Sequence, residues 1–194
     1  MTGPRGYSAE AGSVVVDAAD LLAGWPAAAD RLGDGPVLVH DPVGDAVGVG
    51  IAEALSALGR TTSLVTQDQV AGTQLSLTGD LADANRRLQQ AGTAVHKRSV
   101  LRRVTPGTAF IEHVLTGERS EVPCTAVVHC GHRLPDDTLP GEPRAGDCVA
   151  PRTVYEAILE GRRAALALAT AGATPYGGAS GHVHEHPTMA GAAR

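Results

Sequence analysis

Short apolar runs alternate along the chain with segments in which apolar positions recur at helical spacing, a pattern typical of α/β folds. The apolar runs predict strands at Val14–Asp17, Pro36–His40, Thr62–Thr66, Ala94–His96, Val100–Val104 and Ala126–Cys130. The helically spaced segments predict helices at Ala18–Leu32, Val49–Leu58, Leu81–Gln90 and Thr153–Leu168. A hairpin is predicted at Thr108–Pro123, around Gly117. Since Pro36–Thr66 has the length of one βαβ unit, we expect a parallel sheet.

A glycine-bearing turn follows the strand predicted at Pro36–His40. The sequence Asp41-Pro42-Val43-Gly44 leads into a helix that begins with Gly48 and Gly50, where a Rossmann fold has its dinucleotide-binding turn. Gly44 can make the turn, and Gly48 or Gly50 can allow the helix to pack closely on the strand. These three glycines are therefore candidate cofactor-binding residues for NAD(P).

Two features of this turn argue against strong NAD(P) binding. The fingerprint G-x-G-x-x-G starts directly after its strand, whereas Asp41 and Pro42 stand there in this chain, and a carboxylate repels a pyrophosphate. The next strand ends at Thr66 and lacks the acidic residue expected on the adenine ribose, although Asp68 lies close by. The alternative is a nucleotide fold that is kept for its shape.

A second turn, Gly146-Asp147-Cys148, lies shortly before the helix predicted from Thr153. An Asp at such a turn can accept hydrogen bonds from sugar or ribityl hydroxyls, and the N–H groups of the following helix can face a phosphate. Gly146 lets the backbone approach a ligand closely. Asp147 is the main candidate binding residue here, with Arg152 as a phosphate or interface contact. The alternative role for Asp147 is a cap of the helix.

Composition and charge narrow the function classes. The chain of 194 residues is 43% hydrophobic and 19% charged, as expected of a globular protein, and its aromatic content of 3% requires an aliphatic core. A net charge of −5 argues against nucleic acid or an anionic membrane as partner. The sequence predicts no membrane span and no signal peptide, so we expect a cytoplasmic protein. In a reducing compartment the three cysteines, whose spacing matches no metal motif, are expected to be small buried residues.

Other candidate groups do not add a catalytic or metal-ligating residue. The basic cluster Lys97, Arg98, Arg102 and Arg103 could reach a 2′-phosphate or a partner surface, and the alternative is a solvated face. The isolated histidines have no acid–base partner in the sequence. The motif His182-x-His184-x-His186 lies in a Gly-rich tail that we expect to be unstructured.

Several of these segments occur together, in this order, in one family. Val37–Leu55, Ser63–Thr66, Gly131–Asp137 and Gly146–Arg152, with its Gly-Asp-Cys-x-Ala-Pro-Arg stretch, resemble the C-terminal third of the trimethylamine dehydrogenase and dienoyl-CoA reductase group of flavin oxidoreductases. The resemblance covers roughly residues 13–170, and the stretch from Gly146 is its most specific part. It adds Cys148 to the candidate cofactor-binding residues.

The resemblance implies a domain organisation. Family members carry an FMN-binding barrel, cysteines for a 4Fe-4S cluster, and an FAD- or ADP-binding domain into which an NAD(P)-binding-like domain is inserted. It therefore predicts an α/β chain with a Rossmann-like NAD(P)-binding-type domain at 36–130 and the returning half of the FAD/ADP-binding domain at 131–170. Residues 1–35 would form an N-terminal segment with a connecting strand and helix, and residues 171–194 a flexible tail.

A half-domain of one turn and one helix would expose an apolar helix face, so the resemblance predicts a partner. The chain would be the small nucleotide-binding-type subunit of a heteromeric flavin/iron-sulfur oxidoreductase, for example an amine dehydrogenase or demethylase, and would support electron transfer. A large barrel-containing flavoprotein subunit would hold FMN and the 4Fe-4S cluster and share an FAD or ADP site with this chain; an electron-transfer flavoprotein could dock. The alternatives are an NAD(P)H-oxidising module of an enoate reductase-type complex and a non-catalytic assembly subunit.

Overall fold

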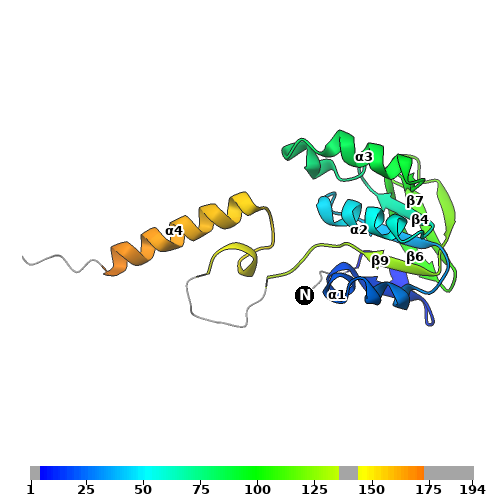
Figure 1. Ribbon diagram of the computed structural model, residues 1–194, viewed down its shortest axis with the longest axis horizontal. Coiled ribbons are helices and arrows are strands. Elements are labelled where there is room, and N and C mark those ends of the chain that lie inside the picture. Colours follow the sequence, from blue (N-terminus) through cyan, green and yellow to red (C-terminus); the bar gives the residue numbers. More distant parts are fainter. Residues whose placement is uncertain (1–4, 136–143, 173–194) are drawn as a thin grey trace, which may run out of the picture. The chain divides into compact units, whose positions relative to one another are not determined.

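The structure, a computed structural model, describes residues 5–135 and 144–172 and divides the chain into two units, 1–135 and 136–194 (Figure 1). The strands of the first unit are β1 (Ser8–Ala9), β2 (Val14–Asp17), β3 (Val37–Asp41), β4 (Thr62–Thr66), β5 (Ala94–His96), β6 (Ser99–Thr105), β7 (Thr108–His113), β8 (Arg119–Pro123) and β9 (Ala126–His129). Its helices are α1 (Ala18–Ala23), α2 (Ala46–Ala57) and α3 (Leu81–Gln90), with 3-10 helices η1 (Ala27–Leu32) and η2 (Thr73–Leu77).

The centre of the first unit is a five-stranded parallel sheet of order β2-β9-β3-β4-β5. Its middle strand β3 is buried along its whole length, as are all four residues of β9. Continuous apolar runs suit such strands because both faces of the sheet are covered. The parallel register between β3 and β4 pairs Val37 with Thr62 and Asp41 with Thr66, so the polar ends of these strands lie at one edge of the sheet.

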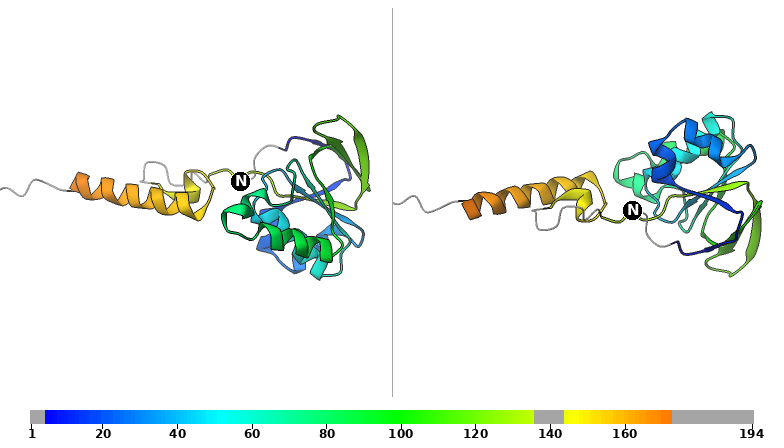
Figure 2. Two further views of the ribbon diagram at one scale, coloured as in Figure 1. Left: turned by 90° about the horizontal axis from the view of Figure 1, so that it is seen from above. Right: turned by 90° about the horizontal axis from the view of Figure 1, so that it is seen from below.

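Helices α1, α2 and α3 cover one face of this sheet, and a second sheet covers the other (Figure 2). Alternate residues of β3 point to opposite faces, so Val37 and Val39 pack under the helices, whereas Leu38 packs under the second sheet. Each helix contributes a fully buried leucine to the first core, namely Leu21, Leu55 and Leu88. Burying one such side chain stabilises the fold by about 1.5–3 kcal/mol.

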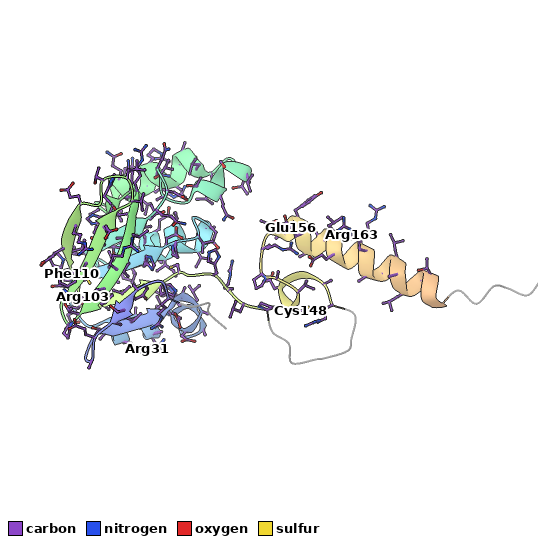
Figure 3. The ribbon with its side chains drawn as sticks, turned by 180° about the vertical axis from the view of Figure 1, so that it is seen from behind. Arg31, Arg103, Phe110, Cys148, Glu156 and Arg163 are labelled. Carbon is purple, nitrogen blue, oxygen red and sulfur yellow. The ribbon has the colours of Figure 1, made fainter. Side chains whose placement is uncertain are left out.

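The second sheet has the order β1-β6-β7-β8, with β6, β7 and β8 forming an antiparallel meander. Strand β1 pairs with β6 in parallel over only two residue pairs. The inner face of the meander buries Leu101, Val104 and Ile111. On β6 and β7, the Arg103 guanidinium lies 4.1 Å from the centre of the Phe110 ring (Figure 3).

The second unit, in its described part, consists of the 3-10 turn η3 (Gly146–Cys148) and the helix α4 (Val154–Gly172). At the start of α4 the Thr153 hydroxyl donates to the Glu156 carboxylate, and the two residues have the spacing of a capping box. Gly146 lies against Ala157, and its backbone N–H donates to the Glu160 carboxylate at 2.9 Å. These contacts hold η3 on the first turns of α4.

Most elements agree with the sequence-based predictions, and one helix does not. The helix predicted over Ala18–Leu32 is wrong, because α1 ends at Ala23 and the chain continues after Pro26 as the 3-10 helix η1. Gly24 follows α1, and proline has no N–H with which to continue an α-helix. The strand predicted at Val14–Asp17 is confirmed, and it pairs with β9 as a strand of the central sheet.

Candidate functional site

The first candidate site lies at the carboxyl ends of β3 and β9. The chain leaves β3 through α2 to β4 on one side, whereas β9 lies on the other side of β3, so the strand order reverses between β3 and β9. In open parallel sheets, ligands bind in the crevice at such a reversal. His40 and Asp41 end β3, and His129 ends β9. Strand geometry therefore brings these side chains to the edge where a nucleotide would bind.

Backbone donors in the turn after β3 are already used by the chain's own carboxylates. Gly44 has a φ of +74°, which favours glycine, and its N–H donates to Asp41 Oδ1 at 2.8 Å. The N–H of Val43 donates to the same oxygen at 3.2 Å. Asp45 caps α2 by accepting the N–H of Val47 at 2.8 Å, and its other oxygen pairs with Arg133 at 3.1 Å. A pyrophosphate would have to compete with these carboxylates for the same positive donors.

Asp41 is the most deeply buried carboxyl at this edge, with no exposed surface. Burial raises its pKa to about 6, the two N–H donors at Val43 and Gly44 lower it, and the charges of Asp45 and Asp68 raise it. Its Oδ2 atom has no hydrogen-bond partner among the described residues. The edge thus carries acidic groups where a dinucleotide needs positive potential.

The three glycines predicted as cofactor contacts have different surroundings. Gly44 is buried in the turn, beside the Asp68 carboxylate. Gly48 is buried in the first turn of α2, where a Cβ would lie 2.6 Å from Asp41 Cγ. Gly50 is exposed, and a Cβ there would meet no atom within 4 Å. The close packing of helix on strand that was expected at Gly48 or Gly50 is found at Gly48.

We expect opposite effects from adding a methyl group at the two helical glycines. Gly48→Ala should destabilise the fold by about 1–3 kcal/mol, because the new Cβ overpacks the buried Asp41 carboxyl. Gly50→Ala should stabilise it by about 0.5–1 kcal/mol, because alanine favours the helix and the site is open. Urea unfolding of both variants measures this difference. Equal free energies of unfolding for Gly48→Ala and Gly50→Ala would show that α2 does not pack on Asp41.

An aromatic cluster near the same edge is absent from the sequence-based predictions. His40 and His129 stack with ring centroids 5.3 Å apart, and their Nδ1 atoms are 3.1 Å apart. Tyr7 places its ring edge-on against both, at 5.2 and 5.5 Å. Neither histidine has an acid–base partner nearby in the sequence. The one signal in the sequence is that both lie at or near the ends of segments predicted as buried strands, Pro36–His40 and Ala126–Cys130.

In the second unit, η3 gathers the other predicted residues. Gly146 is buried with a φ of +73°. The Asp147 side chain is exposed and, within the part of the chain that the structure describes, has neither a hydrogen bond nor an ion pair. Cys148 Sγ lies 3.0 Å from the Ala145 carbonyl oxygen (Figure 3), and Arg152 pairs with Glu160. Thr153 and Glu156 stand at the start of α4, and Asp147 makes no hydrogen bond to that helix within the described residues.

Other predicted groups lie away from these two places. In the basic cluster, Arg102 pairs with Glu112 and Arg103 with Glu10 on the surface of the meander. The histidine motif at 182–186 lies outside the described residues. Over residues 5–135 and 144–172, no group of three or more His, Cys, Asp or Glu side chains is placed to hold a metal ion. Among the helices in those ranges, none has both the length and the apolar composition needed to cross a membrane.

Two cavities of about 510 and 370 Å³ lie along α3 and share Asn85 and Lys97. The larger is also lined by Gln69 and Leu81, and the smaller by Thr93. Neither includes a residue from the ends of β3 and β9 or from η3. The two candidate sites are therefore the carboxyl ends of β3 and β9 and the turn η3.

No protein-family model and no curated protein sequence matches this chain. Its fold is nevertheless found in solved structures. Histamine dehydrogenase from Rhizobium sp. 4-9 aligns with a TM-score of 0.73 and 20% identity, over 84% of this chain and 28% of its own. The 6-hydroxypseudooxynicotine amine oxidase from Pseudomonas geniculata N1 aligns with a TM-score of 0.68 and 21% identity, over 77% and 24%. A 2-naphthoyl-CoA reductase aligns with a TM-score of 0.68 and 17% identity, over 84% and 25%.

The chain thus spans about a quarter of the length of these proteins. At such identities the likeness concerns the fold, which confirms the predicted α/β class with a Rossmann-like parallel sheet. Two of the three neighbours are named for the oxidation of amines, and the third for the reduction of a CoA ester. The architecture of this chain is therefore that of a Rossmann-like module found in oxidoreductases.

Proposed function

We propose that this chain is the small nucleotide-binding-type subunit of a heteromeric flavin oxidoreductase and completes an ADP or FAD site on a larger partner. The observation that carries the proposal is the combination, within the described part of the second unit, of an exposed apolar helix face and an exposed carboxylate that has no hydrogen-bond partner among those residues. The fold shared with an amine dehydrogenase, an amine oxidase and a CoA-ester reductase supports the reaction class.

Helix α4 exposes large apolar side chains on a scale that is unusual for a helix in a folded domain. The exposed fractions are 75% for Val154, 71% for Tyr155, 67% for Ile158, 58% for Leu166 and 56% for Leu168. At 100° per residue, Val154, Ile158, Tyr155 and Leu166 lie within one third of the helix circumference, which also holds the exposed Arg162. An apolar sheet face of a partner would bury this stripe, and the first half of the interrupted FAD/ADP-binding domain, carried by the partner, would supply that face.

The Asp147 carboxylate is free to accept hydrogen bonds from a ligand. Gly146 holds η3 on α4, through Ala157 and Glu160, and so fixes the backbone on which Asp147 stands. Gly146, Cys148 and Arg152 would contribute to the same site, although Arg152 would have to exchange its pairing with Glu160 to reach a phosphate. FMN and a 4Fe-4S cluster, if present in the complex, would belong to the partner, and an electron-transfer flavoprotein could accept the electrons.

The first unit is expected to bind NAD(H) weakly. The N–H groups of the turn after β3 donate to Asp41, and an N–H group at the start of α2 donates to Asp45. Both carboxylates repel a pyrophosphate. Calorimetric titration of the chain with NADH should give a dissociation constant in the millimolar range or no measurable heat. Low-micromolar affinity accompanied by hydride transfer would contradict this expectation and favour an NAD(P)H-oxidising module.

That second candidate function, a module feeding electrons to an enoate reductase-type partner, is favoured by one observation, the fold shared with 2-naphthoyl-CoA reductase. Analysis of the nucleotides released from the purified complex separates the candidates. Tightly held ADP or FAD supports the first, and NAD(H) turnover supports the second. A complex that holds no nucleotide beyond the partner's own would indicate an assembly subunit and overturn the proposal.

A further inference from the structure

A row of polar residues crosses the central sheet beneath the N-terminal segment. Asp17 of β2 is paired in register with His129 of β9, and His129 is paired with His40 of β3. Residues in register on neighbouring parallel strands point to the same face. On β3 and β9 the alternation places this face with Leu38 and Val127, in the core under the meander.

The segment Arg5–Glu10 lies over this row. Tyr7 packs edge-on against both imidazole rings, at 87° to His40 and 68° to His129. The histidines keep only 7% and 2% of their surface exposed. Burial also raises the pKa of the Tyr7 hydroxyl to about 12, so that this group is neutral.

The attachment of this segment is weak. Strand β1 pairs with β6 through only two residue pairs, and Glu10 adds one backbone hydrogen bond to Val104 at 2.9 Å. The Arg5–Asp17 and Glu10–Arg103 ion pairs also hold the segment, but both are at least partly exposed, and such pairs contribute little to stability. The buried Tyr7 hydroxyl has no hydrogen-bond partner among the described residues. Burying this hydroxyl against the histidines therefore costs stability.

The contact between His40 and His129 favours the state in which both rings are neutral. With both rings neutral, one Nδ1–H donates to the other Nδ1 across 3.1 Å. A tautomer in which His129 donates leaves its buried Nε2 as an acceptor, and so avoids an unpaired N–H at that atom. An added proton would place a charge beneath Tyr7 and beside the apolar core, where burial disfavours it.

We propose that Arg5–Glu10 is a pH-sensitive strap, closed over His40 and His129 when both are neutral and released when the pair gains a proton. The charged and titratable groups that act on the pair are Arg5 and Tyr7 from the strap, Asp17 from β2, and His132 after β9, while Cys130 acts on Tyr7. Asp17 favours protonation of His129, whereas Arg5 and His132 oppose it. Release would expose the two imidazoles at the carboxyl ends of β3 and β9.

The sign of the pH dependence follows from the histidines. Burial, and then the neighbouring His129, lower the pKa of His40 to about 3, and burial lowers that of His129. A group whose pKa is lowered in the closed state stabilises closure above its ordinary pKa, and this stabilisation is lost as the pH falls below about 6.5. For His40 alone, the ratio of open to closed strap should rise about 30-fold from pH 7.5 to pH 5.0.

NMR of the full chain tests the strap. Between pH 7.5 and 5.0 the backbone amides of Ser8, Ala9 and Glu10 should become mobile in heteronuclear relaxation, while those of β7 stay rigid. The double variant His40→Asn/His129→Asn should abolish this change, and His132→Asn, which alters an exposed neighbour, should retain it. A strap that stays rigid at pH 5.0 while the imidazoles titrate, or one that opens equally in the double variant, would overturn the proposal.

A second variant keeps the test independent of the histidine substitutions. Tyr7→Ala removes the ring that covers the pair, so the strap should be mobile at pH 7.5 and the pKa values of His40 and His129 should move toward 6.5. Leu115→Ala, at an exposed apolar position of the first unit outside the cluster, is the control and should leave both unchanged. Histidine pKa values that stay low in Tyr7→Ala would show that the strap does not keep the pair neutral.

Discussion

Replacing Ile158 by aspartate is expected to weaken assembly with the large partner by about 30- to 1000-fold. The side chain lies in the middle of the uncovered stripe of α4 and is 67% exposed in this chain, so the change should leave the chain folded. In the proposed complex it would be buried in the centre of the interface, where single residues contribute about 2–4 kcal/mol. Analytical ultracentrifugation of the chain mixed with its partner flavoprotein gives the dissociation constant.

The matched control is Leu77→Asp. Leu77 lies on η2 of the first unit and is 77% exposed, so it introduces the same charge at an equally exposed apolar position. Thermal unfolding should be unchanged in both variants, and only Ile158→Asp should impair assembly. An assembly constant unaffected by Ile158→Asp would mean that α4 is not the contact surface, whereas equal losses in both variants would indicate a nonspecific effect of charge.

The second large effect is expected at Asp147. In the reconstituted complex, Asp147→Ala should weaken the binding of ADP or FAD by roughly 10- to 150-fold. An ionised acceptor forms charge-assisted hydrogen bonds to ligand hydroxyls that contribute about 1.5–3 kcal/mol, and 1.4 kcal/mol corresponds to a factor of ten. The carboxylate is exposed and makes no hydrogen bond within the described residues, so its loss should not reduce the thermal stability of the chain itself.

Bound nucleotide is measured after gel filtration, together with the unfolding temperature, and Asp34→Ala serves as the control. Asp34 is an exposed aspartate in the loop before β3, in the other unit. Asp147→Asn should retain part of the affinity, because the amide oxygen still accepts a hydrogen bond without the charge. Full nucleotide occupancy in Asp147→Ala with unchanged stability would remove Asp147 from the proposed site.

The strands and helices that follow from the local pattern of apolar and polar residues could be predicted from the sequence. Short apolar runs such as Val37–His40, bounded by turn residues, favour strands covered on both faces, and β3, β4 and α3 have the predicted bounds to within one residue. Two departures from the dinucleotide fingerprint were also visible in the sequence: Asp41 stands directly after the strand, and the first glycine, Gly44, comes three residues later. The helix expected over Ala18–Leu32 was wrong, because periodicity alone does not weigh Gly24 and Pro26 against the apolar positions around them.

The candidate sites required more than the sequence. That Asp41 takes the backbone N–H groups of its own turn, and that Gly48 rather than Gly50 packs on it, depends on distances between atoms that are separated along the chain. The same holds for Tyr7, His40 and His129, which come from three segments and meet only because β9 lies beside β3. Strand β1, two residues long, has no periodicity that would reveal it.

The sequence by itself determined the α/β class, the parallel strands and the turn chemistry, because these follow from side-chain periodicity and from the backbone preferences of Gly and Pro over a few residues. Only the tertiary structure decided which buried polar groups have hydrogen-bond partners and which do not. Within the described residues, the Asp41 oxygen without a hydrogen-bond partner, the two histidines whose pKa burial lowers, and the exposed apolar face of α4 all arise from burial and neighbours. Burial is a property of the packed chain, since it depends on residues far apart in sequence.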